Sequence, residues 1–183
     1  MLEGLDHPGI PAYRDHFEAT PDGPGEEVLF CLVRDFVDGE SLQERIEAGR
    51  SYDEAEVVDI AGQLLDILAY LHGQSPPIIH RDIKPANVIL GSDGRVHLVD
   101  FGTVQAEVAR ETGGSTIVGT AGYVAPEQLM GRAAPASDIY ALGVTIASLL
   151  SGMAPTEFPA MASSSMSWAS SKHRPAWPIW SVA

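Results

Sequence analysis

A polar octapeptide followed by a tight hairpin constrains the fold of this chain more than any other feature of its sequence. The octapeptide His-Arg-Asp-Ile-Lys-Pro-Ala-Asn occupies residues 80–87 and precedes two short apolar runs, 88–90 and 96–99. These runs flank the turn sequence Gly-Ser-Asp-Gly, which predicts a β-hairpin. The hairpin places Asn87 and Asp100 at its open end, so two polar side chains from separate segments are expected to lie together there.

Strand and helix patterns precede the octapeptide. Residues 10–17 and 28–33 have strand character and are separated by a Pro- and Gly-rich turn, which predicts another hairpin. Ser41 with Glu44, and Ser51 with Glu54, match the capping box and predict two helix starts. In the second helix, apolar residues recur at three- and four-residue steps and predict one buried face, made of Val57, Ile60, Ala61, Leu64, Leu65, Leu68 and Leu71.

Residues 139–150 form the longest strongly apolar stretch of the chain. A helix needs roughly 20 apolar residues to cross a bilayer, so this shorter stretch predicts a buried core helix and no membrane segment. The N-terminus lacks the basic and apolar regions of a signal peptide.

The order of motifs resembles that of eukaryotic-type Ser/Thr protein kinases, in a bacterial-like form. Asp-Phe-Gly at 100–102, Ala-Pro-Glu at 125–127 and Ser-Asp-Ile-Tyr-Ala-Leu-Gly at 137–143 follow the octapeptide as they do in that family. The resemblance covers residues 1–158. It implies an α+β, protein-kinase-like fold with an incomplete small lobe, represented by its late strands only, and the N-terminal half of the mainly helical large lobe.

The resemblance also divides the chain. Residues 1–34 would be a remnant of the small lobe, residues 35–40 the hinge and residues 41–158 the large-lobe part. Residues 159–183 have a biased composition without helical or strand period, and we expect this tail to be poorly ordered.

The family's chemistry assigns roles to the octapeptide. Asp82 would orient the hydroxyl proton of a Ser or Thr acceptor in a protein substrate, and Lys84 would steady the transferred phosphate of ATP. Thr120 would bridge Asp82 and Lys84. Asn87 and Asp100 would hold Mg²⁺, and through it ATP.

The resemblance further implies an adenine site. Backbone groups of Asp35 and Val37 would bind the adenine, and Ile89 would lie beneath its ring. Arg34 falls at the back of this pocket, where a guanidinium needs a carboxylate partner.

Several other residues receive structural or regulatory roles by resemblance. His80 would pack against Phe101, and Asp138 would hold the backbone of the octapeptide. Glu127 would be a buried carboxylate whose arginine partner lies beyond this chain, which is costly. Arg81 resembles the arginine that pairs with a phosphorylated activation segment; in that segment Thr112, Ser115 and Thr116 are either regulatory phosphorylation sites or ordinary solvated hydroxyls.

Composition limits partners and location. A formal net charge of -14 argues against a nucleic-acid partner or an anionic membrane surface. Cys31 is the only cysteine, so no intramolecular disulfide can form, and a reducing, cytoplasmic setting is expected. Cys31 itself is either a small buried hydrophobe or a reactive thiol near the nucleotide pocket.

The Gly-rich phosphate loop and the strand with the phosphate-contacting lysine occur nowhere in these 183 residues. We therefore expect a partial catalytic domain with little or no turnover by itself. Two alternatives remain: a pseudokinase-like scaffold that docks a partner, and a small-molecule phosphotransferase of the aminoglycoside or choline type. The Ala-Pro-Glu motif favours protein substrates over the second alternative.

Overall fold

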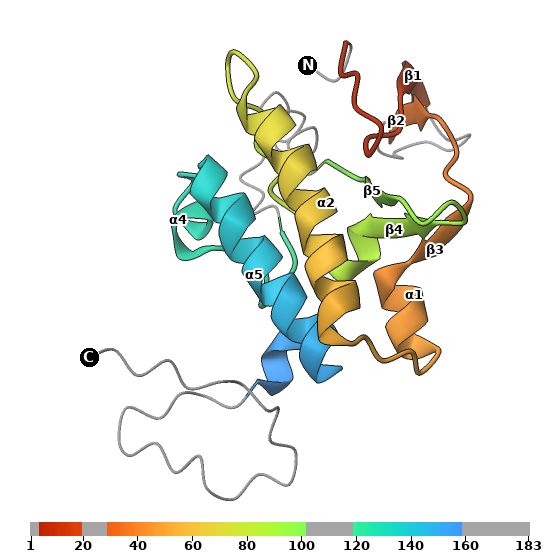
Figure 1. Cartoon of the computed structure of the whole chain (residues 1–183). Helices are drawn as coiled ribbons and strands as arrows, with labels where there is room; N and C mark the ends of the chain where they lie inside the picture. Colours follow the sequence, from red (N-terminus) through yellow and green to blue (C-terminus); the bar gives the residue numbers. More distant parts are fainter. Residues whose placement is uncertain (1–3, 20–28, 102–118, 159–183) are drawn as a thin grey trace, which may run out of the picture.

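The computed structural model describes residues 4–19, 29–101 and 119–158, which form two small antiparallel sheets beside a pair of long helices (Figure 1). The α+β fold class is confirmed. Along the chain the elements are β1 (Tyr13–Ala19), β2 (Leu29–Arg34), β3 (Gly39–Ser41), α1 (Leu42–Glu47), α2 (Glu54–His72), η1 (Pro85–Asn87), β4 (Val88–Gly91), β5 (Val96–Leu98), α4 (Pro126–Leu129), α5 (Pro135–Ser151) and η2 (Pro155–Glu157).

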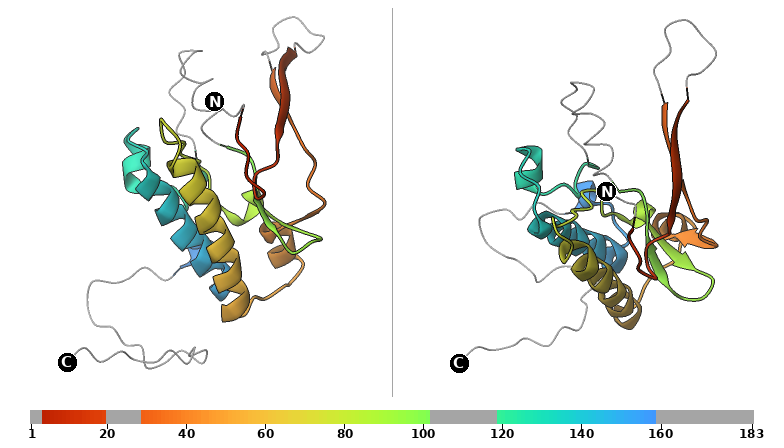
Figure 2. Two further views of the ribbon diagram at one scale, coloured as in Figure 1. Left: turned by 45° about the horizontal axis from the view of Figure 1, so that its top comes forward. Right: turned by 90° about the horizontal axis from the view of Figure 1, so that it is seen from above.

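Strands β1 and β2 form the predicted first hairpin, which projects away from the helices (Figure 2). Its register sets Tyr13 opposite Arg34 and Phe17 opposite Cys31. β1 begins three residues later than expected because Ile10 belongs to a turn, in which its amide donates to the carbonyl of His7 at 2.9 Å. The side chain of Ile10 is buried in the core instead. Cys31 is half-buried on β2.

The hairpin β4–β5 is also confirmed, and it carries a third strand that the sequence did not reveal. β3 pairs with β4, so the sheet order is β3-β4-β5. The two backbones approach so closely that a Cβ on Gly39 would lie 2.5 Å from the carbonyl oxygen of Leu90. Glycine at this position therefore lets residues 39–41 join the sheet that supports the octapeptide.

Helix α2 begins at a different cap from the one predicted. Asp53, not Ser51, is the N-cap: its carboxylate accepts from the amide of Glu56 at 2.8 Å, and Glu56 accepts from the amide of Asp53 at 3.0 Å. With this start, Tyr52 precedes the cap and Val57 is the fourth helical residue, the positions of a hydrophobic staple. Both side chains belong to the core, which favours the later start.

The buried face of α2 also differs in part from the prediction. Ile67 is buried, whereas Leu65 is 47% exposed. At about 100° per residue, Leu65 lies about 140° around the helix from Ile60, outside the buried face. The other predicted residues are buried except Ala61, which is half-buried.

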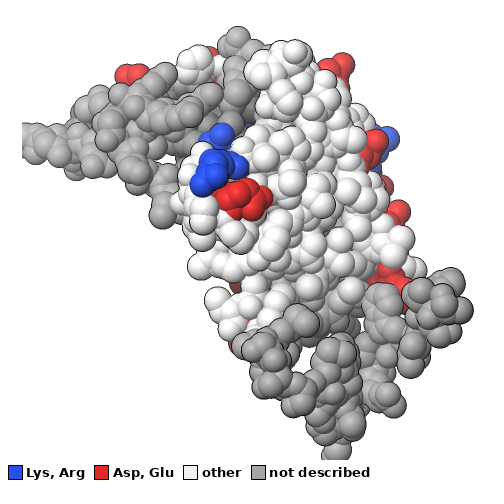
Figure 3. All heavy atoms as spheres, turned by 90° about the vertical axis from the view of Figure 1, so that its left-hand side faces the viewer, with Lys and Arg blue, Asp and Glu red and all other residues white. Residues whose placement is uncertain are grey.

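Helix α5 starts at Pro135, earlier than the predicted 139–150, and it is buried on one face only. Proline suits the first helical position because it has no amide hydrogen to leave unpaired. Ala141, Leu142 and Leu149 belong to the core, as expected of a core helix, whereas Ile139, Tyr140 and Leu150 on the other face are 45%, 46% and 42% exposed. The face of the molecule over α4 and α5 carries few charged side chains (Figure 3).

The core lies where α2 packs against α5 on one side and against β5 on the other (Figures 1 and 2). One core cluster contains Leu64, Leu68 and Leu71 of α2 together with Val88 and Leu98 of the sheet. In the part of the chain that the structure describes, no helix is long and apolar enough to cross a membrane.

Candidate active site

Asp82 is the centre of a dense hydrogen-bonding cluster. Its Oδ2 lies 2.8 Å from Lys84 Nζ and accepts from Asn87 Nδ2 at 2.8 Å, while its Oδ1 accepts from the Thr120 hydroxyl at 3.1 Å. Lys84 Nζ also donates to Thr120 Oγ1 at 2.6 Å. The side chains of Asp82 and Lys84 are 15% and 21% exposed, so this ion pair is sheltered but still reachable from solvent.

The short helix η1 positions Lys84 and Asn87 next to Asp82. Lys84 is its N-cap and Asn87 its last residue, and Pro85 begins the helix because its ring fixes a helical φ. Asn87 Nδ2 donates a second bond, at 2.7 Å, to the backbone carbonyl of Asp82. The amide group of Asn87 is thus oriented with its nitrogen toward Asp82 and its oxygen available to another partner.

Asn87 and Asp100 are brought to the same end of the β4–β5 hairpin, as the sequence predicted. The amide of Val99, next to Asp100, donates to the carbonyl of Asn87 at 2.9 Å. No cluster of three or more His, Cys, Asp or Glu side chains suited to a metal occurs among the described residues. One carboxylate and one amide oxygen nevertheless fit Mg²⁺, which keeps several waters and binds few protein ligands.

Asp138, at the start of α5, holds the backbone of the octapeptide as expected. This fully buried carboxylate accepts from the amide of His80 and the amide of Arg81, both at 2.9 Å, and lies 2.8 Å from His72 Nε2. Arg81 has a φ of 71°, a left-handed conformation that costs free energy for a residue other than glycine. The two oxygens of Asp138 stabilise this strained turn immediately before Asp82.

His80 has a structural position. It is completely buried, and its ring lies 4.7 Å from that of Phe101, as predicted. Burial lowers the pKa of His80, although Asp138 and the Val99 carbonyl oppose this effect. The neutral ring donates from Nε2 to the Val99 carbonyl at 3.1 Å and accepts from the Asp82 amide at Nδ1 at 3.3 Å.

Arg34 has the carboxylate partner that its position requires, and the partner is Asp100. Arg34 Nη1 lies 2.9 Å from Asp100 Oδ1. Asp100, like Arg81, has a left-handed backbone, with a φ of 60°. The sequence indicated the need for a partner but not its identity, because β2 and the end of β5 are far apart along the chain.

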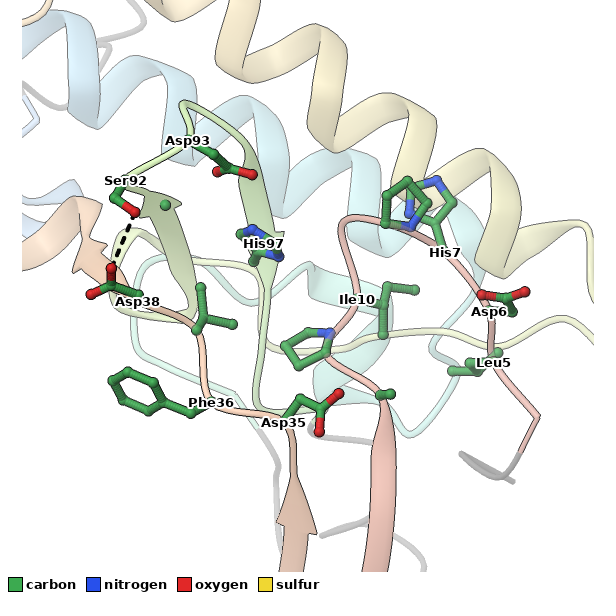
Figure 4. A pocket seen from close by; sticks show the side chains of 15 residues that line it. Leu5, Asp6, His7, Ile10, Asp35, Phe36, Asp38, Ser92, Asp93 and His97 are labelled. Carbon is green, nitrogen blue, oxygen red and sulfur yellow. Dashed lines mark hydrogen bonds between the residues drawn. The ribbon is translucent and has the colours of Figure 1, made fainter.

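The predicted adenine-binding residues do not gather in one hollow. Asp35 and Val37 line an open hollow of about 570 Å³ between residues 5–12, residues 35–38 and the β4–β5 turn (Figure 4), whereas Ile89 lies outside it. The Asp35 amide donates to the Ala12 carbonyl at 2.9 Å. Its carboxylate is held by two 2.6 Å bonds from Arg14, which lower the pKa of Asp35. The adenine-binding roles therefore stay predictions.

Glu127 differs from the expectation of an unpaired buried carboxylate. It is only partly buried, and its Oε1 accepts from the Ser137 hydroxyl at 2.6 Å, a bond that lowers the pKa of Glu127. Ser137 in turn accepts from the Ala134 amide at 3.1 Å, so Glu127 is tied to the start of α5.

Some supporting residues were missed from the sequence. Gln128 Nε2 donates to the Arg81 carbonyl at 2.7 Å, and His72 contacts Asp138. Neither residue belongs to one of the kinase motifs, so the sequence around them did not indicate these contacts. The phosphorylation candidates Thr112, Ser115 and Thr116, and the tail at 159–183, lie outside the described residues.

Comparison with known proteins places this geometry in context. A family model described as "Protein kinase domain" matches residues 1–181. Serine/threonine-protein kinase B of Synechocystis sp. is 37% identical over 161 residues, which is 82% of this chain and 26% of the relative. Serine/threonine-protein kinase PknA of Mycobacterium tuberculosis is 35% identical over 153 residues, 82% of this chain and 35% of the relative.

A protein of the same name, PknA, from Nostoc sp. is 41% identical over 135 residues, which is 70% of this chain and 24% of the relative. The chain thus spans roughly a quarter to a third of the length of these relatives, between 24% and 35%.

Proposed function

Because the chain belongs to the protein kinase domain family, we propose that its octapeptide at residues 80–87 is a catalytic loop, which serves the transfer of the γ-phosphoryl group of ATP to Ser or Thr hydroxyls of proteins. The observation that carries this proposal is the cluster in which Lys84, Asn87 and Thr120 all bond the carboxylate of Asp82. Such a cluster fixes one carboxylate in position, and this chemistry depends mainly on positioning and electrostatics.

Each side chain of the cluster has a separate task in the proposed reaction. Asp82 accepts the hydroxyl proton of the acceptor, so that the oxygen is oriented for attack on phosphorus. Lys84 is held by Thr120 and Asp82 and stabilises the negative charge of the phosphoryl group during its transfer.

Asn87 and Asp100 are the residues that would hold Mg²⁺, which neutralises charge on the nucleotide phosphates when bound. For adenine we propose the backbone of Asp35 and Val37, with Ile89 beneath the ring. Lys84 follows the Ser/Thr-type loop pattern, and the relatives compared above are named serine/threonine-protein kinases. The single cysteine fits a reducing compartment, for which we propose the cytoplasm.

The test is label transfer from γ-³²P-ATP with Mg²⁺ to a library of Ser- and Thr-containing peptides, with incubations long enough to record slow turnover. Asp82→Asn should reduce transfer by about 10²- to 10⁴-fold, because it removes the base but keeps the shape of the side chain. The control is Asp59→Asn on α2, where the side chain is exposed and lies outside the proposed site, and it should leave transfer within twofold.

Transfer that Asp82→Asn leaves unchanged would refute the proposed role of this loop. Absence of label transfer by the wild-type chain agrees with the low turnover expected from the sequence. Absence of both label transfer and divalent-metal binding at Asp100 would refute the phosphotransferase function and favour the scaffold alternative. Label on free aminoglycoside or choline but not on peptides would instead favour a small-molecule phosphotransferase.

A further inference from the structure

The ion pair between Arg34 and Asp100 joins the β1–β2 hairpin to the segment that follows the β4–β5 hairpin, at the proposed metal site. Arg34 is the last residue of β2, and Asp100 follows β5 by two residues. Their charged atoms, Nη1 and Oδ1, are 2.9 Å apart. A residue of the first hairpin thus neutralises the carboxylate that the proposed function assigns to Mg²⁺.

Another cation can replace Arg34 in this ion pair. The side chain of Arg34 is 32% exposed and that of Asp100 is 58% exposed, so water screens the attraction and can replace either partner. A competing cation can therefore take the place of Arg34 at the Asp100 carboxylate.

Other cations near the site have different partners. Lys84 is held by Asp82 and Thr120, and Arg14 is held by Asp35 on the same hairpin as Arg34. Among the ion pairs of the described residues, Arg34 is the basic side chain that lies against Asp100.

We infer that Arg34 competes with the divalent metal for Asp100 and thereby sets the metal affinity of the site. A guanidinium and a divalent ion at one carboxylate repel each other. The metal must therefore displace Arg34 or bind next to its positive charge, and both lower the metal affinity. This inference rests on the proposed function, in which Asp100 is a metal ligand. It adds a residue of the small-lobe hairpin that acts on the metal through Asp100.

The experiment measures Mn²⁺ binding to the full chain without nucleotide, from the electron paramagnetic resonance signal of free Mn²⁺. Arg34→Met should tighten binding roughly tenfold, since it removes the competing charge and keeps much of the side-chain volume. Arg34→Lys should bind within about threefold of wild type, because it retains the charge. Circular dichroism verifies that each variant is folded.

Two further variants make the result specific. Arg14→Met removes the same charge from the same hairpin but faces Asp35, and it should change Mn²⁺ affinity less than twofold. Asp100→Asn should abolish the site. Unchanged affinity in Arg34→Met, with loss in Asp100→Asn, overturns the inference and leaves the proposed metal ligand intact. Binding that survives Asp100→Asn overturns the metal assignment itself.

Discussion

At the scale of single residues, Asp138 holds the backbone of the octapeptide at residues 80–87 from the start of α5. It is completely buried and accepts bonds from two backbone amides of the loop, one of which belongs to the strained Arg81. Asp138→Asn would remove the charge and turn an amide NH₂ group toward one of these donors. We expect a loss of about 2–4 kcal/mol in the free energy of unfolding.

Urea unfolding followed by far-ultraviolet circular dichroism measures this loss. The control is Asp59→Asn, the same substitution at an exposed position of α2, which should cost less than about 0.5 kcal/mol. Equal stability of the two variants would contradict the anchoring role of Asp138.

Contacts of single residues were predicted correctly where the resemblance to protein kinases indicated which distant residue lies nearby. The contacts of Asp138 with the loop and of His80 with Phe101 are of this kind. The partner of Arg34 could not be predicted, because the family rarely has an arginine at this position and its pattern therefore indicates no partner for one. The expectation that Glu127 is buried without a partner was wrong, because it is partly buried and accepts a hydrogen bond from Ser137, ten residues later.

At the scale of secondary structure, the start of α2 depends on a choice between two overlapping capping signals. Asp53 caps the helix, whereas Ser51 lies outside it. Asp53→Ala should therefore lower the free energy of unfolding by about 1 kcal/mol, because one helix amide loses its acceptor. Ser51→Ala should cost no more than about 0.3 kcal/mol. Urea titrations of both variants decide between the caps, and a larger loss in Ser51→Ala would favour the start first predicted.

Elements with strong local patterns were predictable, and elements that depend on distant pairing were not. The β4–β5 hairpin follows from its turn sequence and its two apolar runs. β3 is only three residues long, Gly-Glu-Ser, and exists because β4, which begins 47 residues after the end of β3, provides its partner. For α2, the periodicity predicted that one face is buried but not where that face ends. Leu65 was therefore predicted to be buried, whereas Ile67 is the buried residue.

At the scale of the whole molecule, the excess of carboxylates acts against compactness. The chain has 25 Asp and Glu residues but 11 Lys and Arg residues, so 14 carboxylates would lack a Lys or Arg partner even with complete pairing. Several pairs are exposed on both sides, including Arg14 with Asp35 and Arg95 with Asp93. Each such pair contributes about 0–1 kcal/mol, so repulsion among the remaining carboxylates should outweigh them.

Salt should therefore raise the thermal stability of this chain. The Debye length falls from about 30 Å at 0.01 M to about 8 Å at 0.15 M ionic strength, which screens distant repulsion more than contacts near 3 Å. We expect Tm, measured by circular dichroism at pH 7, to rise by about 2–6 °C over this range, because roughly 1 kcal/mol of repulsion is removed. Sodium chloride and choline chloride should act alike, since screening depends on ionic strength and not on the cation. A fall in Tm would mean that the exposed ion pairs, and not the unpaired carboxylates, dominate the electrostatics of the fold.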